Sequence, residues 1–163
     1  MQLVNRIAVA IFILDQLSKY LVVHVMRLDQ RQEVGVFPPF LNFRMAWNQG
    51  INFGLFQSGA DVMRWVLIAV ALVIAAWVWL WVRRERHQPR VLVSAGLLIG
   101  GALGNVVDRL IYGAVADFLN MSCCGLENPY AFNVADIAIF AGAAGLVLFA
   151  GADGAKPRRG RTS

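Results

Sequence analysis

The segment from residue 65 to 82, WVLIAVALVIAAWVWLWV, contains no charged side chain. A helix of about 20 such residues is long enough to cross the hydrocarbon core of a bilayer. Because lipid offers the backbone no hydrogen-bond partner, such a segment favours a helix, which satisfies its own N–H and C=O groups. The composition agrees, since 58% of the 163 residues are hydrophobic and only 15% are charged, which is unusually apolar for a soluble domain.

Three further segments are similarly apolar, so the sequence predicts an all-α membrane protein with four transmembrane helices. The expected spans are about 7–26, 62–82, 91–107 and 134–152, within one integral membrane domain of residues 1–152. All five prolines lie outside these spans, as helix interiors favour. The first span carries Asp15 and Lys19 and lacks a small-residue cleavage site, so we interpret it as retained rather than as a secretory signal.

The basic residues predict the orientation. With four spans, both termini lie on one side together with the loop between the second and third spans. Nine of the fifteen lysines and arginines fall on that side, namely Arg6, Arg83, Arg84, Arg86, Arg90, Lys156, Arg158, Arg159 and Arg161. The positive-inside rule assigns this side to the cytoplasm, together with a basic tail, 153–163, that we expect to be disordered. The division of charge among short juxtamembrane segments argues against nucleic-acid binding.

The two loops on the other side, 27–61 and 108–133, are where we expect the function. In the first loop, LNFRMAW (41–47) alternates with the period of a strand, which predicts a small extracytoplasmic β-sheet. The stretch NQGINFG (48–54) then supplies two glycines, typical of a turn or of a close backbone approach. In the second loop, Cys123 and Cys124 are adjacent and seldom form a mutual disulfide in that arrangement, so we assign them no catalytic role.

Ionisable residues in or beside the spans are costly and call for a reason. Asp15 and Lys19 are four residues apart and share a helix face, which favours an internal ion pair or a contact with a neighbouring helix. Asn105 and Asp108 project from nearly one face at the end of the third span, next to Arg109. The sequence therefore predicts a polar cluster at that end.

Asp117 and Asp136 are the remaining acids of interest, one in the loop after the third span and one at the start of the fourth. Both are expected at the same depth near the outer surface, so they could share a site. Two close carboxylates do not both ionise easily, so one keeps its proton while the other acts as a base on water, as in an aspartic protease. The alternative is that the two residues are helix caps or independent surface acids.

Other catalytic plans have less support. Ser18 and Lys19 are adjacent on a helix and do not face each other, which disfavours a Ser-Lys dyad. His24 and His87 are predicted on opposite membrane faces, which disfavours zinc, and the chain has neither a G-x-S-x-G turn nor a phosphate-binding loop.

Two non-hydrolytic classes remain open. One is a small transporter in which Asp15, Lys19 and Asp108 line a path through the bilayer, although the spans show no inverted repeat and the acids gather at one face. The other is a membrane scaffold that packs through small residues, namely Gly100, Gly101 and Gly104.

Five motifs in order resemble those of the bacterial lipoprotein signal peptidases, also called signal peptidase II, over about residues 7–152. They are DQLSK (15–19), NQGINFG (48–54), GALGNVVDR (101–109), VADF (115–118) and FNVAD (132–136). The resemblance implies a multi-pass aspartyl endopeptidase of the bacterial inner membrane that uses no metal ion, and we expect no other cofactor. We also expect the protein to work as a monomer. It implies cleavage of diacylglyceryl-modified prolipoproteins on the amino side of the lipidated cysteine, with the lipidated prolipoprotein and membrane lipid as partners.

The resemblance also assigns roles to residues by motif position. Asp117 and Asp136 match the catalytic pair. Asp15 and Lys19 match a first-span motif with a structural role. The residues that match substrate-binding and supporting positions are Asn48, Gly50, Phe53, Gly54, Asn105, Asp108, Arg109 and Asn133.

Overall fold

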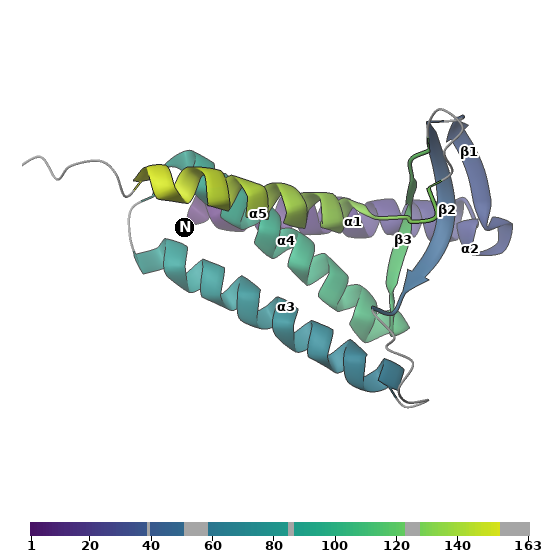
Figure 1. Ribbon diagram of the computed structural model, residues 1–163, viewed down its shortest axis with the longest axis horizontal. Helices are drawn as coiled ribbons and strands as arrows, with labels where there is room; N and C mark the ends of the chain where they lie inside the picture. The colour runs from purple at the N-terminus through teal and green to yellow at the C-terminus, as the bar shows by residue number, and fades with distance from the viewer. Residues whose placement is uncertain (39, 51–58, 85–86, 123–127, 154–163) are drawn as a thin grey trace, which may run out of the picture.

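The computed structural model describes residues 1–38, 40–50, 59–84, 87–122 and 128–153. It is mostly helical, with a small β-sheet at the end of the helices far from the N-terminus (Figure 1). The helices are α1 (Gln2–Lys19), the π-helical η1 (Tyr20–Val25), α2 (Leu28–Arg31), α3 (Gly59–Arg84), α4 (Pro89–Tyr112) and α5 (Val134–Asp153). The strands are β1 (Glu33–Phe37), β2 (Leu41–Asn48) and β3 (Val115–Asn120).

Three helical segments of the described chain are long and apolar enough to cross a membrane. They are Gln2–Val25, Asp61–Arg84 and Pro89–Tyr112, each of 24 residues. They correspond to the first three predicted spans. The fourth predicted span falls on α5, whose apolar stretch Val134–Ala150 is shorter.

Helix α4 packs against α1, α3 and α5, and its glycines allow close approach to two of them. A Cβ atom built on Gly100 would lie 2.5 Å from the backbone oxygen of Ala8 in α1. A Cβ on Gly101 would lie 2.5 Å from the backbone oxygen of Ala135 in α5. Small residues of this kind bring helix backbones together in membranes, where apolar burial drives association less than in water.

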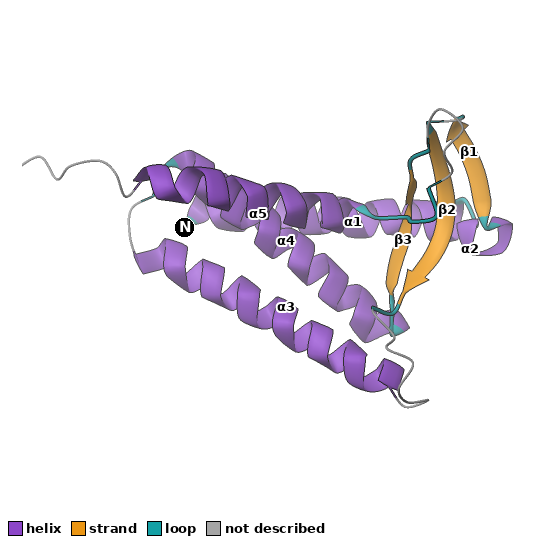
Figure 2. Cartoon of the chain, in the orientation of Figure 1, coloured by secondary structure: helices purple, strands orange, loops and turns teal. Residues whose placement is uncertain are grey.

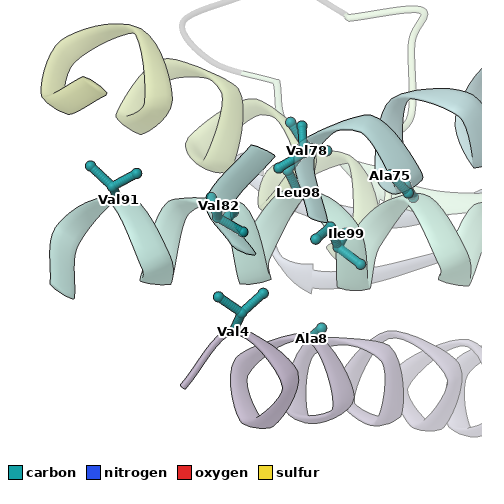
Figure 3. Close-up of a cluster of buried hydrophobic side chains, with 10 residues drawn as sticks. Val4, Ala8, Ala75, Val78, Val82, Val91, Leu98 and Ile99 are labelled. Atoms are coloured by element: carbon teal, nitrogen blue, oxygen red, sulfur yellow. The ribbon is translucent and has the colours of Figure 1, made fainter. Parts of the chain in front are cut away.

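Apolar side chains fill the half of the helical region that lies away from the sheet. Figure 3 shows Val4 and Ala8 of α1 below α4, with Val91, Leu98 and Ile99 of α4 above them. Side chains of α3 complete the same cluster. The ionisable residues singled out from the sequence lie toward the other end of these helices, near the sheet.

The three strands form an antiparallel sheet in the order β1-β2-β3 (Figure 2). Strand β2 confirms the strand predicted from LNFRMAW, but a shift of register between Phe43 and Ala46 interrupts its alternation. Val22, Leu28 and Phe118 form a second apolar cluster, with Phe43 packed against it. This cluster attaches the sheet to η1 and α2.

Two expected boundaries differ from the structure. Asp108 and Arg109 were placed at the start of a loop, but they lie inside α4, which continues to Tyr112 and ends at Gly113 with a φ of 77°. Glycine adopts this left-handed conformation readily and is a common helix stop. VADF was also placed in a loop, but it belongs to β3, because its backbone pairs with β2 and places Asp117 opposite Ala46.

Candidate active site

Asp117 is fixed by a strand and by two amide donors. Strand β3 places its side chain in a buried position, 3% exposed. Asn48, at the end of the neighbouring strand β2, donates from Nδ2 to Asp117 Oδ2 at 3.0 Å. Asn133 donates from Nδ2 to Asp117 Oδ1 at 2.5 Å. Each carboxylate oxygen therefore has one side-chain donor.

Asp136 lies in the first turn of α5, where Asn133 precedes the helix. The backbone N–H of Asp136 donates to Asn133 Oδ1 at 2.9 Å, and the backbone N–H of Asn133 donates to Asp136 Oδ2 at 3.2 Å. This reciprocal pair is a capping box, with an asparagine in place of the usual serine or threonine. The other oxygen, Oδ1, accepts a hydrogen bond from Asn105 Nδ2 at 2.9 Å. Asp136 therefore does cap a helix, as the alternative interpretation of the sequence held. Its Oδ1 nevertheless points away from the cap, toward Asn105.

Asn133 joins the two acids, because its side chain bonds to Asp117 while its backbone bonds to Asp136. The asparagine is fully buried, at 0% exposure. The structure thus brings together the two aspartates that the sequence placed at one depth. Asp117 is neither a helix cap nor a surface acid, since it is buried in the middle of a strand.

Burial first, and then the negative charge of Asp136, raise the pKa of Asp117 from its ordinary value of 3.8 to about 6. Hydrogen bonds from Asn48 and Asn133 and the positive charge of Lys19 oppose this shift without cancelling it. Asp117 is therefore suited to hold a proton at mildly acidic pH.

A buried ion cluster lies next to the acid pair. Lys19 Nζ contacts Asp15 Oδ2 at 2.8 Å and Asp108 Oδ2 at 2.7 Å, and it donates to Asn105 Oδ1 at 3.2 Å. The predicted ion pair on the first span and the predicted polar cluster at the end of α4 are thereby both confirmed and form one cluster. The backbone N–H of Ala135 donates to Asp15 Oδ1 at 2.9 Å, and that of Ala116 donates to Asp108 Oδ2 at 3.2 Å. The cluster thus holds the residues next to both Asp136 and Asp117.

The remaining predicted site residues are placed as follows. Arg109 donates from Nη1 to the backbone oxygen of Asn105 at 3.3 Å. Gly50 has a φ of 89°, and its N–H donates to Asn48 Oδ1 at 2.9 Å. The rest of the predicted turn or close approach, from residue 51, lies outside the described residues. Phe53 and Gly54 lie outside the described residues, as do Cys123 and Cys124.

Gln16 was missed by the sequence reasoning. Its Nε2 donates to Asp108 Oδ1 at 2.9 Å and to the backbone oxygen of Gly104 at 3.3 Å. The available signal was a polar amide inside an apolar span, directly after Asp15. An amide there needs partners from a neighbouring helix, because lipid provides none.

A cavity of about 120 Å³ lies beside the ion cluster rather than beside the acid pair. Lys19, Asp108 and Ala116 contribute to its wall. Successive residues of a strand point to opposite faces, so Ala116 and Asp117 face opposite sides of β3. The cavity and the acid pair are therefore on different faces of this strand.

A buried carboxyl group with a raised pKa, close to a second carboxyl group, is an arrangement suited to acid–base chemistry. Among the residues that the structure describes, no group of three or more His, Cys, Asp or Glu side chains is arranged to hold a metal ion.

Comparison with known proteins connects this geometry to an activity. The family model for Signal peptidase (SPase) II matches residues 7–151. The chain is 43% identical over 141 residues to a lipoprotein signal peptidase of Methylobacterium sp. (strain 4-46), covering 86% of this chain and 84% of that protein. It is 41% identical over 138 residues to a lipoprotein signal peptidase of Alteromonas mediterranea, covering 84% of this chain and 74% of that protein.

Solved structures agree with the fold. One structure described as a bacterial membrane enzyme superposes with a TM-score of 0.74 at 25% identity, covering 100% of this chain and 96% of that chain. A second structure with the same description gives a TM-score of 0.74 at 26% identity, covering 91% of this chain and 92% of that chain.

Proposed function

The chain belongs to the signal peptidase II family, which removes signal peptides from prolipoproteins, and from this premise we propose that Asp117 and Asp136 carry out the hydrolysis. The observation that supports this assignment most strongly is the asparagine bridge. Asn133 bonds to both carboxyl groups, so the two acids are held together in one polar site. Because its pKa is raised, Asp117 is suited to be the acid that holds a proton.

The reaction uses one acid in each protonation state. The ionised carboxylate removes a proton from a water molecule, and the water oxygen attacks the peptide carbonyl. The protonated carboxyl donates a hydrogen bond to the carbonyl oxygen, where negative charge develops. Collapse of the tetrahedral intermediate breaks the C–N bond, and the amine leaves with a proton from the pair. The pair gains one proton from water and gives one to the amine, so it ends the cycle with the number of protons it had at the start.

Asparagines and one arginine support this pair. Asn48, Asn105 and Asn133 each donate to one of the two carboxylates, which limits the orientations available to the acids. The positive charge of Arg109 interacts with both Asp117 and Asp136. We assign substrate binding to this set together with Asp108 and with Gly50, Phe53 and Gly54, which share a motif with Asn48.

The substrate is a prolipoprotein whose cysteine already carries a diacylglyceryl group, and the cut falls on the amino side of that cysteine. Such a substrate presents its scissile bond near the membrane surface, because the signal segment and the lipid chains both lie in the bilayer. The position of the acid pair supports this assignment. Asp117 lies in strand β3 and Asp136 in the first turn of α5, where the helices meet the sheet.

We also propose that α5 crosses the membrane as a fourth span, within one domain of residues 1–152. It packs against α4 and runs from the sheet back toward the end where α1 begins (Figure 1). Arg6, Arg83 and Arg90 lie in the helix ends on that side. By the positive-inside rule they support a cytoplasmic location for both termini and the basic tail, with the acid pair on the extracytoplasmic side of the inner membrane.

The experiment that tests the function uses purified protein in detergent. It is mixed with a prolipoprotein carrying the diacylglyceryl group, and in parallel with the same precursor lacking the lipid. We expect a gel shift for the lipidated precursor alone, with mass spectrometry locating the lipidated cysteine at the new amino terminus.

A parallel reaction contains EDTA, for which we expect no loss of rate. Equal cleavage of both precursors would contradict the proposed substrate. Loss of activity with EDTA that zinc restores would contradict the two-carboxylate mechanism.

A further inference from the structure

The ammonium group of Lys19 has three polar partners. It is only 5% exposed. An ammonium group has three N–H donors and no acceptor. Its contacts are with the carboxylates of Asp15 and Asp108 and with the amide oxygen of Asn105. Two of these partners are carboxylates of opposite charge, whereas the third, Asn105, is neutral.

The neutral partner is the informative one, because a side-chain amide has a donor end and an acceptor end. Only the oxygen of Asn105 is able to face a group that can do nothing but donate. With Oδ1 directed at Lys19, Nδ2 faces Asp136 and donates to its Oδ1 at 2.9 Å. A flipped amide would place N–H against the ammonium and oxygen against the carboxylate, both of which are repulsive.

We propose that Lys19 is a positioning residue for the acid pair, which fixes the orientation of the Asn105 amide so that its nitrogen donates to Asp136. This inference rests on the proposed function of Asp117 and Asp136. It gives the first-span motif a role in the reaction beyond holding helices together. Lys19 does not touch the acid pair through Nζ in any described hydrogen bond; it acts through Asn105.

Other charged groups also face the pair and must be separated from this effect. Helix α1 contributes Asp15 with Lys19, and α4 contributes Asp108 and Arg109. Each of the two acids also faces the other, from β3 and α5. The positive charge of Lys19 lowers the pKa of Asp117 directly, although this is the smallest of the contributions to that group. The experiment must therefore distinguish a direct charge effect from one transmitted by Asn105.

The first test compares the pH dependence of kcat/KM for the native protein and for Lys19→Met. Without Lys19 the oxygen of Asn105 keeps only the longer hydrogen bond from Asn133 Nδ2, at 3.4 Å. The amide then turns its oxygen toward the pair more readily, so the pair retains its proton to higher pH. We expect the alkaline limb of the profile to move up by about one pH unit and the maximum to fall about tenfold, the effect of losing one hydrogen bond to a charged group. Lys19→Arg keeps a donor-only cation and should restore the native limb.

A purely structural role gives a different result. Loss of folded protein lowers kcat/KM by the same factor at every pH, and the limb stays in place. That outcome for Lys19→Met would overturn the inference. If Lys19→Met does not fold, Lys19→Gln replaces it, since an amide of similar length accepts as well as donates and does not fix the Asn105 orientation. An unmoved limb for Lys19→Gln would overturn the inference equally.

The second test asks whether the effect passes through Asn105. The protonated carboxyl C=O stretch of the pair is followed by infrared spectroscopy against pH, which needs no turnover, in native protein, Lys19→Met, Asn105→Ala and the double variant. We expect Lys19→Met to shift the titration in the native background and to add little in the Asn105→Ala background. An equal shift in both backgrounds would show that the charge acts directly and would overturn the role of Asn105.

These tests separate this inference from the proposed function. If Asp117→Asn and Asp136→Asn abolish cleavage but Lys19→Met leaves the limb and the infrared titration unmoved, only the positioning role of Lys19 fails. If the aspartate variants cleave at the native rate, the proposed function fails, whatever Lys19 does.

Discussion

At the scale of single residues, asparagine amides decide how the two acids are presented. Asn48 and Asn133 donate to Asp117, and Asn105 donates to Asp136. A neutral donor orients a carboxylate without bringing a full positive charge to it. The pair therefore keeps a raised affinity for a proton, which a lysine or arginine in the same position would suppress.

The first prediction at this scale concerns the pH dependence of the reaction. Burial and the charge of Asp136 raise the pKa of Asp117 to about 6. If the pair must hold one proton to act, kcat/KM should fall as pH rises through that value in the free enzyme. Initial rates of lipidated-precursor cleavage at low substrate concentration measure this limb. A rate that rises steadily from pH 5 to pH 9 would contradict the shared proton.

The second prediction is that Asp117 lowers the stability of the protein above mildly acidic pH. Below its ordinary pKa of 3.8 the carboxyl is protonated in the folded and the unfolded chain alike, and up to about 6 only the folded protein keeps the proton. The free energy of unfolding therefore falls as pH rises through this window, on the order of 3 kcal/mol by the difference in pKa.

Asp117→Asn should remove this pH slope, and thermal unfolding in detergent at pH 4, 5, 6 and 7 measures it. The matched control is Asp29→Asn, at an exposed position in α2. It should leave the slope as in the native protein. A slope that persists in Asp117→Asn would show that another group causes it.

Sequence reasoning found the acids but not the way in which they are held. Asp117 and Asp136 stood out because they are charged beside apolar spans, and the motif resemblance paired them. The Asn133 bridge and the direction of the Asn105 amide depend on three segments meeting in space, for which no local pattern exists. The sequence analysis treats capping and catalysis by Asp136 as alternatives. The structure instead places Asp136 both in a capping box and beside Asn105.

At the scale of elements, the glycines of α4 set the distance between the helices that carry the site. Gly101 lies against the backbone of Ala135, the residue before Asp136. Gly104 lies against Asp15, whose carboxylate holds the N–H of Ala135. The start of α5 is therefore positioned from α4 and α1 together.

The third prediction follows from this contact. Gly101→Ala places a Cβ 2.5 Å from the backbone oxygen of Ala135, which cannot move aside as a flexible side chain would. We expect a loss of about 1–3 kcal/mol in stability, as for other overpacked sites. We also expect kcat/KM to fall at least about tenfold, because Asp136 moves with α5. Thermal unfolding and precursor cleavage measure the two effects.

The control is Ala141→Leu, which adds a larger side chain to an exposed position of α5. It should change neither quantity appreciably. Native activity in Gly101→Ala would contradict the idea that this contact positions Asp136.

Elements that follow from hydropathy were predicted well, whereas strand β3 was not. The first three spans match helices α1 with η1, α3 and α4. VADF gives no strand signal, because nearly every residue of β3 is buried and the alternation typical of a half-exposed strand is absent. Its strand conformation depends on pairing with β2, which is distant in the sequence.

At the scale of the whole molecule, the helix ends that carry Arg6, Arg83 and Arg90 lie opposite the end that carries the sheet (Figure 1). A charge distribution of this kind orients a membrane protein during insertion. In the proposed orientation, the acid pair lies at the membrane surface where a signal segment ends. The proposed orientation and the proposed substrate thus require the same placement of the sheet.

The fourth prediction tests this orientation. A green fluorescent protein joined after residue 163 should fluoresce, and an alkaline phosphatase joined at the same position should be inactive, because the proposed orientation puts this terminus in the cytoplasm. The same two reporters joined in the 121–130 region, after β3, should give the reverse result. An active phosphatase at the terminus would contradict a fourth crossing by α5.

The central claim, hydrolysis by the two aspartates, is tested most directly by one cleavage assay. Asp117→Asn, Asp136→Asn and the control Asp29→Asn are purified in equal amounts and incubated with a diacylglyceryl-modified prolipoprotein. We predict that kcat/KM falls by about 10³-fold or more in each of the first two, as for loss of an essential acid or base. The control should cleave as the native protein does. Cleavage at the native rate by either Asp117→Asn or Asp136→Asn would contradict the claim.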